Sequence, residues 1–258
     1  MLIDTHCHLD EYSEEELQLA LQHMKDHIMI VSGVNDTTNE RVLHLCEQYS
    51  NIYGVVGIHP EEVDSIKENS FEKLVSYLKY PKIVGIGEIG LDYHYSKENI
   101  DLQKSIFKKQ LDLAEQYHKP VVIHSREALQ DTYDILKQYP NLKGSVVLHA
   151  YSGSLEMARE FSKLGVFFGV GGVVTFKNAG KIKEVVKEIP LDCFLLETDS
   201  PYLTPEPYRG KKNEPYYVHF VAEKIAEIKE IEIENVIETT TKTAKEIFSL
   251  PILSSKEV

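Results

Sequence analysis

The amino-acid sequence predicts an α/β fold of the (β/α)8 TIM-barrel type. Three observations favour this class: a length of 258 residues, a hydrophobic content of 42%, and short apolar segments that alternate with amphipathic ones. Alternating strands and helices indicate a parallel sheet, and eight such repeats close into a barrel. A doubly wound sheet usually has fewer strands and a glycine-rich phosphate turn, and the sequence contains no such motif. Length alone would also permit two smaller domains, but the uninterrupted repeat leads us to expect one barrel domain over residues 1–258.

Eight segments rich in Val, Ile, Leu or Phe are interpreted as buried strands. Their C-terminal ends lie 20 to 36 residues apart, which is the spacing of a strand followed by a helix. In chain order the segments are Leu2 to His6, Ile28 to Gly33, Tyr53 to His59, Ile83 to Glu88, Val121 to His124, Val146 to His149, Val166 to Gly169 and Phe194 to Asp199.

The segments between and after the strands have the periodicity of amphipathic helices. Apolar residues recur at helical spacing from Glu98 to His118, and two more helical stretches, Tyr216 to Ile228 and Ile233 to Phe248, follow the eighth strand. The Pro-rich, polar stretch from Thr204 to Pro215 predicts a long loop before them. The glycine cluster from Gly169 to Gly172 is typical of a tight turn, so we assign it no nucleotide cofactor.

The composition restricts the classes of partner. A net charge of −13 gives an acidic surface that repels polyanions, so any nucleic-acid substrate must be bound locally. No segment is long and apolar enough to span a membrane, and the N-terminus lacks the basic and apolar parts of a signal peptide. Cys7, Cys46 and Cys193 form no paired framework, which suits a reducing compartment. We expect a cytoplasmic, monomeric protein without membrane association.

Six side chains that can bind metal fall at the ends of predicted strands, where barrels of this type carry their active sites. Imidazole nitrogens and carboxylate oxygens suit Zn, Mn and related ions, and Mg is also permitted. Six ligands exceed the three protein ligands that one catalytic ion usually takes, so we expect two divalent ions. Glu88 should bridge them, because the fourth strand lies between the other ligands. These divide into His6, His8 and Asp199 for the first ion, and His124 and His149 for the second.

Seven short motifs resemble the signatures of the TatD-type metal-dependent deoxyribonucleases, in that family's order. The resemblance covers roughly residues 1 to 250 and implies a metal-dependent hydrolase, a cytoplasmic nuclease that cleaves phosphodiester bonds and in some members trims single strands from the 3′ end. The six residues already assigned match the family's metal motif. Tyr151 stands where the family often has Phe, and the closing segment TTTKTAKEIF matches only loosely, which leaves substrate preference open. The motifs are DTHCHLD (Asp4 to Asp10), GIHP (Gly57 to Pro60), GEIGLDY (Gly87 to Tyr93), HSREA (His124 to Ala128), HAYSG (His149 to Gly153), ETDSPYL (Glu197 to Leu203) and RGKKNEP (Arg209 to Pro215).

The same residues indicate a mechanism in which two ions activate a shared water. Asp199 is the candidate general base, and Glu88 holds both ions. Glu197 lies on the same face of the eighth strand and is either an orienting group for a ligand or a structural carboxylate. Asp92 could orient a ligand or form a loop turn. His59 also ends a predicted strand, but taken alone it is more typical of a hydrogen-bonded structural residue than of a ligand.

Substrate contacts are predicted in the loops at the strand ends. Cationic side chains there would bind phosphate or form an ordinary solvated surface, and aromatic rings would stack on a nucleobase or simply pack. The family's loop motif also includes two residues, Asn213 and Glu214, for which the spacing indicates no role. The candidates are Arg126, Arg209, Lys211 and Lys212 for phosphate, and Tyr93, Tyr151 and Tyr202 for stacking.

Two other functions fit the sequence. The same barrel and ions could hydrolyse an amide, ester or lactone, since metals polarise carbonyl groups as well as phosphoryl groups. A nuclease should have an open cleft with cationic and aromatic walls, whereas a small-molecule hydrolase should close over its ligand. A non-catalytic binding barrel should have lost a metal ligand, and none is lost here. The ligands alone do not separate the two hydrolases, and the resemblance to the TatD-type family favours a nuclease that uses Mg, Mn or Zn on single-stranded DNA.

Overall fold

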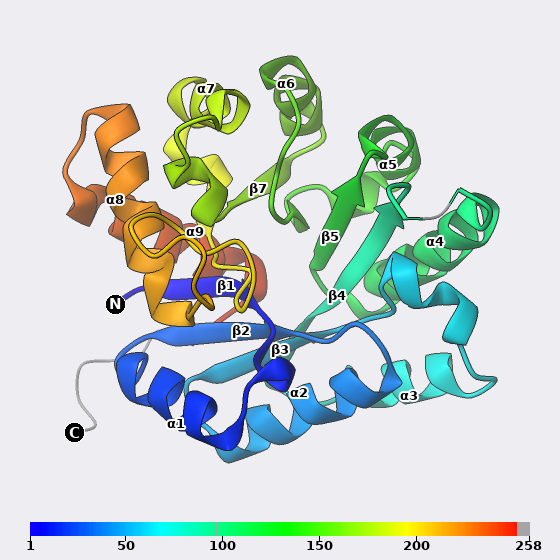
Figure 1. Cartoon of the computed structure of the whole chain (residues 1–258). Helices are drawn as coiled ribbons and strands as arrows, with labels where there is room; N and C mark the ends of the chain where they lie inside the picture. The colour runs from blue at the N-terminus through cyan, green and yellow to red at the C-terminus, as the bar shows by residue number, and fades with distance from the viewer. Residues whose placement is uncertain (96, 252–258) are drawn as a thin grey trace.

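The structure is a computed structural model that describes residues 1–95 and 97–251. Eight parallel strands follow one another in sequential order, and helices surround the sheet on the outside (Figure 1). The strands are β1 (Ile3–Cys7), β2 (Ile28–Ser32), β3 (Ile52–Val56), β4 (Ile83–Asp92), β5 (Val121–Arg126), β6 (Val146–Leu148), β7 (Val166–Val170) and β8 (Phe194–Leu196).

The two ends of the sheet meet beside β1 and β8. The backbone amide of Asp199 donates to the carbonyl of His6 at 2.9 Å, and the amide of His8 donates to the carbonyl of Ser200 at 2.7 Å. A parallel bridge joins Cys7 to Ser200 between these two bonds. The sheet is thus closed, and the predicted (β/α)8 barrel is confirmed.

Helices connect successive strands, and two helices follow β8. Capping boxes begin the first two: Ser13 Oγ accepts from the Glu16 amide, and Asn35 Oδ1 accepts from the Thr38 amide. In the described part of the chain, no helix is both long and apolar enough to cross a membrane. The helices are α1 (Glu14–His23), α2 (Asp36–Gln48), α3 (Ser70–Tyr77), α4 (Ile100–Tyr117), α5 (Leu129–Leu136), α6 (Leu155–Lys163), α7 (Gly180–Glu188), α8 (Val218–Lys229) and α9 (Ile233–Phe248).

Apolar side chains pack on both faces of the sheet. Alternate strand residues such as Ile30, Val55 and Val122 form one cluster inside the barrel, and Phe248 and Leu250 at the end of α9 belong to it. A larger cluster packs between the sheet and the surrounding helices. Because the end of α9 covers the barrel interior, the carboxyl ends of the strands form its accessible mouth.

Three strand ends differ from the predicted boundaries by three residues or more, and the first is β3, which ends at Val56 and leaves His59 in the following loop. β4 extends beyond Glu88 to Asp92, because the added residues are buried and pair with β5 as far as Asp92 and Arg126. β8 ends at Leu196, so the segment that carries Asp199 is a turn after the strand. Between this turn and the 3-10 helix η6 (Pro215–Tyr217), the described structure contains the long loop that the sequence predicts.

Candidate metal centre

The barrel mouth brings together the six side chains that the sequence singles out. The histidines come from the ends of β1, β5 and β6, while Glu88 lies within β4 and Asp199 follows β8. The side chain of His6 is fully buried and that of Glu88 is 4% exposed, whereas that of Asp199 is 14% exposed. The centre is therefore shielded below and open toward the mouth.

Glu88 stands between two groups of imidazoles. Its Oε2 lies 3.3 Å from His6 Nε2 and 3.5 Å from His8 Nε2. Its Oε1 lies 2.9 Å from His149 Nε2 and 3.0 Å from His124 Nδ1. Each carboxylate oxygen thus faces a different pair of nitrogens, which is the geometry expected of a residue that bridges two cations.

Asp199 completes the first group. Its Oδ1 lies 3.6 Å from His6 Nε2 and 3.4 Å from His8 Nε2, and these two nitrogens are 3.1 Å apart. Nitrogen and oxygen donors that converge in this way in a buried place fit a divalent cation. The second pair, His124 Nδ1 and His149 Nε2, is 3.3 Å apart and fits a second cation in the same manner.

His59 is a fifth histidine in the centre. Its Nε2 lies 3.3 Å from Glu88 Oε1, in one group with His124. Its Nδ1 accepts from the Glu61 amide, where it caps the 3-10 helix η2 (Pro60–Ser65). The interpretation of His59 as only a structural residue was therefore incomplete. Its position at a predicted strand end, which it shares with the assigned ligands, was the signal that could have placed it here.

Polar groups behind the centre contact the far ring nitrogens of His6 and His124. Ser32 Oγ lies 3.0 Å from His6 Nδ1, and Asp92 Oδ2 lies 2.8 Å from His124 Nε2. Glu197 accepts from the Ala150 amide at 2.5 Å, and the same oxygen lies 3.7 Å from His149 Nδ1. Such contacts fix the ring orientation and the tautomer of metal-binding histidines. Asp92 is thus placed to orient His124, whereas Glu197 lies beyond hydrogen-bond distance of His149 Nδ1. Ser32 escaped the sequence analysis because a serine at a strand end belongs to no motif.

The charges of the centre are strongly coupled. Burial would raise the pKa of Glu88, but the surrounding imidazoles, His149 first, outweigh it and hold that pKa well below its usual range. Burial would likewise lower the pKa of His149, and Glu88 and Glu197 raise it well above the usual value. The pKa of His8 is raised to about 9, because its hydrogen bond to Asp199 and the charge of Glu88 outweigh burial.

Comparison with known proteins agrees with this chemistry. A family model described as TatD related DNase matches residues 3–249. The chain belongs to this family. The resemblance seen in the sequence motifs is thereby confirmed, and the chain is a metal-dependent hydrolase of the TatD family.

Several relatives match over nearly their whole length. An uncharacterized metal-dependent hydrolase of Bacillus subtilis strain 168, YabD, is 42% identical over 97% of this chain and 100% of its own. Another from Escherichia coli K12, YcfH, is 32% identical over 96% of each chain. Among solved structures, the TatD homolog YJJV of Escherichia coli K12 has a TM-score of 0.91 at 31% identity, over 97% of this chain and 98% of its own.

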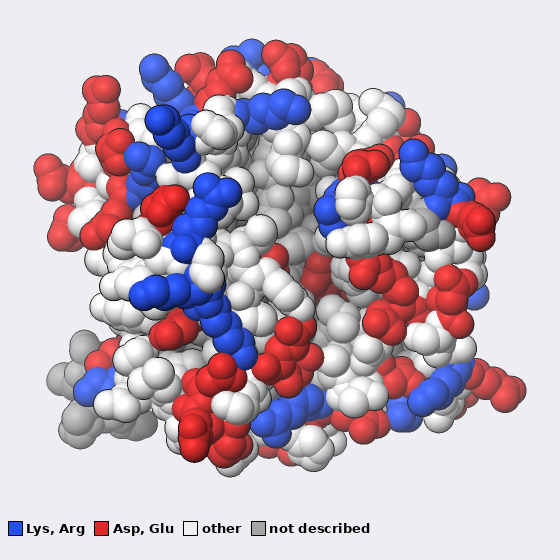
Figure 2. Space-filling view, viewed as in Figure 1, with Lys and Arg blue, Asp and Glu red and all other residues white. Residues whose placement is uncertain are grey.

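The metal centre of this TatD-family hydrolase opens into a cavity of about 800 Å³ at the barrel mouth. We call this the mouth cavity. Figure 2 shows a hollow with acidic side chains along its lower rim and Lys and Arg side chains to its left. Glu11, Glu61 and Glu62 line it, as do the exposed rings of Tyr95 and Tyr202. It is an open cleft with aromatic walls.

Arg126 is the candidate phosphate contact that lines the mouth cavity. Its guanidinium stacks over the ring of Tyr95, 5.0 Å from the ring centroid. Tyr95 is 69% exposed, so one face of this stacked pair remains free for a ligand. Tyr202, a predicted stacking residue, is 48% exposed in the same cavity, and its hydroxyl donates to Glu11.

The other predicted substrate contacts are placed differently. Tyr151 is 4% exposed, packs its ring on Phe168 and donates its hydroxyl to the Ser154 carbonyl, which favours a packing role over stacking in the mouth cavity. Arg209 is exposed, stacks on Phe176 at 4.2 Å and does not belong to the described wall of the mouth cavity, so its contact with a phosphate stays a prediction. Both side chains pack against a nearby ring.

Three further candidates are held by neighbouring groups. Tyr93 donates to Asp131 at 2.7 Å. Lys212 donates to Glu16 at 2.8 Å, and Lys211 lies over the ring of Tyr208. These contacts favour packing and surface roles for the three residues.

Asn213 has a definite position that the sequence could not reveal. It is fully buried, and its amide donates to the carbonyls of Thr198 at 2.9 Å and Tyr202 at 2.6 Å. Its own carbonyl accepts from Tyr12 at 2.5 Å. Asn213 therefore fastens the long loop after β8 to the turn that carries Asp199.

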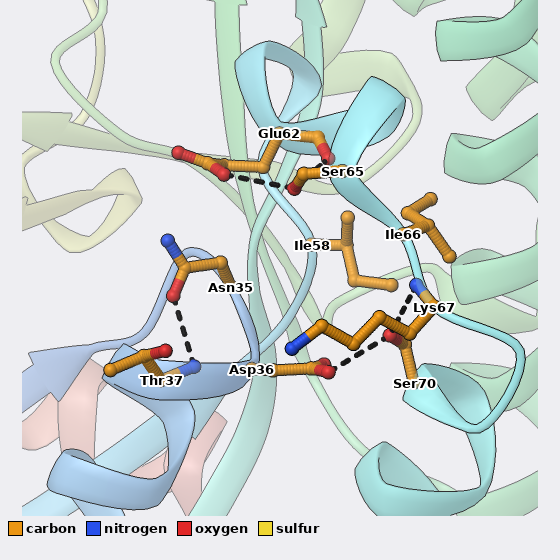
Figure 3. A pocket seen from close by; sticks show the side chains of 9 residues that line it. All are labelled: Asn35, Asp36, Thr37, Ile58, Glu62, Ser65, Ile66, Lys67 and Ser70. Carbon is orange, nitrogen blue, oxygen red and sulfur yellow. Dashed lines mark hydrogen bonds between the residues drawn. The ribbon is translucent and has the colours of Figure 1, made fainter.

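A smaller pocket of about 230 Å³ lies beside the mouth, between the start of α2 and η2 (Figure 3). Its polar groups are paired with one another: Asn35 Oδ1 accepts from the Thr37 amide, and Ser70 Oγ donates to Asp36. The Lys67 amide donates to Ser70 in turn. These bonds satisfy helix ends, so the pocket is explained by local structure.

Proposed function

We propose that this hydrolase cleaves phosphodiester bonds in single-stranded DNA and removes nucleotides from the 3′ end. The observation that carries the proposal is the open mouth cavity, in which Arg126 and Tyr95 stand beside the buried carboxylate and imidazole centre. Arginine binds phosphate and exposed rings stack on unpaired bases. The description of the matching family as related to a DNase supports the same substrate.

Two divalent ions, Mg, Mn or Zn, are the proposed cofactors. His6, His8 and Asp199 would hold one, and His124 and His149 the other, with Glu88 shared between them. When bound, such ions lower the pKa of a water and polarise phosphoryl oxygens.

Asp199 is the proposed general base. Its side chain is the more exposed of the two central carboxylates, at 14% against 4% for Glu88. Burial would raise its pKa, but hydrogen bonding to His8 and the charges of the nearby histidines lower it, so the carboxylate is ionised at neutral pH. Both oxygens of Glu88 face imidazoles, which leaves Asp199 better placed to accept a proton from the mouth side.

Single strands fit the site better than duplexes. A net charge of −13 opposes the extended phosphate contacts that duplex binding requires, whereas a local cleft with one arginine needs only a short segment. The open cleft also favours this substrate over a small amide, ester or lactone, which would call for a closed pocket. All six proposed ligands come from one chain, so we propose a monomer, and the three cysteines without a paired framework support a cytoplasmic location.

The test is hydrolysis of a 5′-labelled single-stranded oligonucleotide by chelator-treated protein to which Mg, Mn or Zn is returned. The expected result is a metal-dependent ladder that shortens from the 3′ end, slower on the matching duplex and absent with Asp199→Asn. Metal-dependent cleavage of small amides or esters without any cleavage of DNA would refute the proposal.

A further inference from the structure

A second cavity of about 400 Å³ lies beside the mouth cavity, and we call it the side recess. It is formed by the β6–α6 loop, the segment from β7 into α7, and the turn after β8. Ala150, Ser152, Asp199 and Leu203 line both cavities. The two cavities therefore adjoin each other, and Asp199, the proposed general base, stands in the wall that they share.

The walls of the side recess are mainly apolar. Val173 and Val174 come from the 3-10 helix η4 (Gly172–Thr175), and Ala179 and Ile182 come from the beginning of α7. Lys181 lies at the exposed rim. This arrangement offers a ring system a dry surface while a cation stands near the opening.

Close backbone approach shapes the recess. A Cβ atom added to Gly172 would lie 2.1 Å from the carbonyl oxygen of Leu203, so only glycine lets the loop after β8 come this near. Leu203 itself has a φ of 53°, a left-handed conformation that is strained for a residue with a side chain. The neighbouring carbonyl of Tyr202 is held by Asn213 at 2.6 Å. The partition between the two cavities is thus fixed in place, which is typical of a preformed ligand site.

We infer that the side recess binds the nucleobase of the 3′-terminal nucleotide whose phosphodiester lies at the metal centre; this rests on the function proposed above. The recess has about half the volume of the mouth cavity, so it suits one base, while the strand extends through the larger space. Apolar walls suit the faces of a base, and Asp199 in the shared wall places the phosphodiester of the same nucleotide next to the metal centre.

The binding test compares dAMP with 2-deoxyribose 5-phosphate, which has the same sugar phosphate but no base. Titration calorimetry with the Mg-loaded protein should give about tenfold tighter binding of dAMP. Val173→Phe fills the recess and should reduce this ratio to about one. Val34→Phe places the same ring in the mouth cavity, outside the recess, and should leave the ratio unchanged.

A kinetic test on DNA separates this inference from the nuclease proposal. On an oligonucleotide with a normal 3′ end, Val173→Phe should cleave about tenfold more slowly than the wild type. On an oligonucleotide whose terminal nucleotide lacks its base, the variant and the wild type should cleave at the same rate. Ala179→Leu serves in place of Val173→Phe if the latter lowers the melting temperature. Base-selective binding that Val173→Phe abolishes, without cleavage of DNA, would retain the recess and refute the nuclease. Cleavage of DNA with a dAMP ratio near one, or with a ratio that Val173→Phe leaves intact, would overturn the recess.

Discussion

The substitution Asp92→Asn should selectively lower the affinity of the protein for one of the two proposed ions. Asp92 Oδ2 lies 2.8 Å from His124 Nε2, and its Oδ1 accepts from the His94 amide at 2.8 Å. Asparagine has a single side-chain oxygen, so it can serve only one of these two donors. His124 would lose its charged partner and its fixed orientation, while no side chain of the first group contacts position 92.

Removal of such an orienting partner typically reduces metal affinity by about 10- to 100-fold. The same range corresponds to about 1.4 to 2.8 kcal/mol of binding free energy. Titration calorimetry with Mn should therefore show two bound ions per chain in the wild type. In Asp92→Asn, one ion should bind with wild-type affinity and the other with reduced affinity. Circular dichroism should show an intact barrel.

Ser32→Ala is the matched variant for the other group, because Ser32 Oγ lies 3.0 Å from His6 Nδ1. It should lower the affinity for the first ion and leave the affinity for the second unchanged. The double variant Asp92→Asn with Ser32→Ala shows whether the two single variants act on different ions, because it should then have reduced affinity for both. Equal loss of both ions in either single variant, or no loss in Asp92→Asn, would refute the division into two groups.

Three other predictions follow from the centre and its surroundings. The pKa of His8 is raised to about 9, so its imidazole is protonated at pH 7 and must lose the proton to bind a metal. Metal affinity should therefore rise as the pH increases toward 9. Calorimetry in buffers of different ionisation enthalpy should detect the released proton. Gly172→Ala should lower the free energy of unfolding by about 1 to 3 kcal/mol in urea titration because its Cβ meets a backbone carbonyl, whereas Gly180→Ala, with nothing within 4 Å, should not. His59→Ala should reduce turnover by about tenfold or more with the barrel intact, and the exposed His44→Ala should match the wild type in the same assay.

The barrel could be predicted because apolar, strand-like segments alternate with amphipathic, helix-like segments eight times along the chain. Parallel strands place their carboxyl ends on one rim, so residues as far apart as His6 and Asp199 were expected to meet there, and their side chains do meet. The position of Glu88 between the two imidazole groups followed from the place of the fourth strand in the sheet. Chain order and strand geometry together were sufficient for these inferences.

Contacts that depend on side-chain direction in loops could not be predicted. Asn213 acts through carbonyls of residues 11 and 15 positions earlier, and Ser32 acts through a ring on the neighbouring strand. Tyr151 packs on Phe168 and Arg209 on Phe176, and sequence spacing indicates neither contact. No periodicity records such local competition between partners.

The seam of the barrel has a consequence for the order in which the protein is made. Hydrogen bonds from Asp199 to His6 and from His8 to Ser200 join the start of the sheet to its end. The N-terminal strand leaves the ribosome first, and its residues His6 and His8 can contact Asp199 only after nearly all the remaining strands have been made. Contacts over such long sequence separations form late in folding. Tight capture of the first proposed ion would thus mark a finished chain, and a prematurely terminated one would have neither a closed seam nor a complete set of ligands.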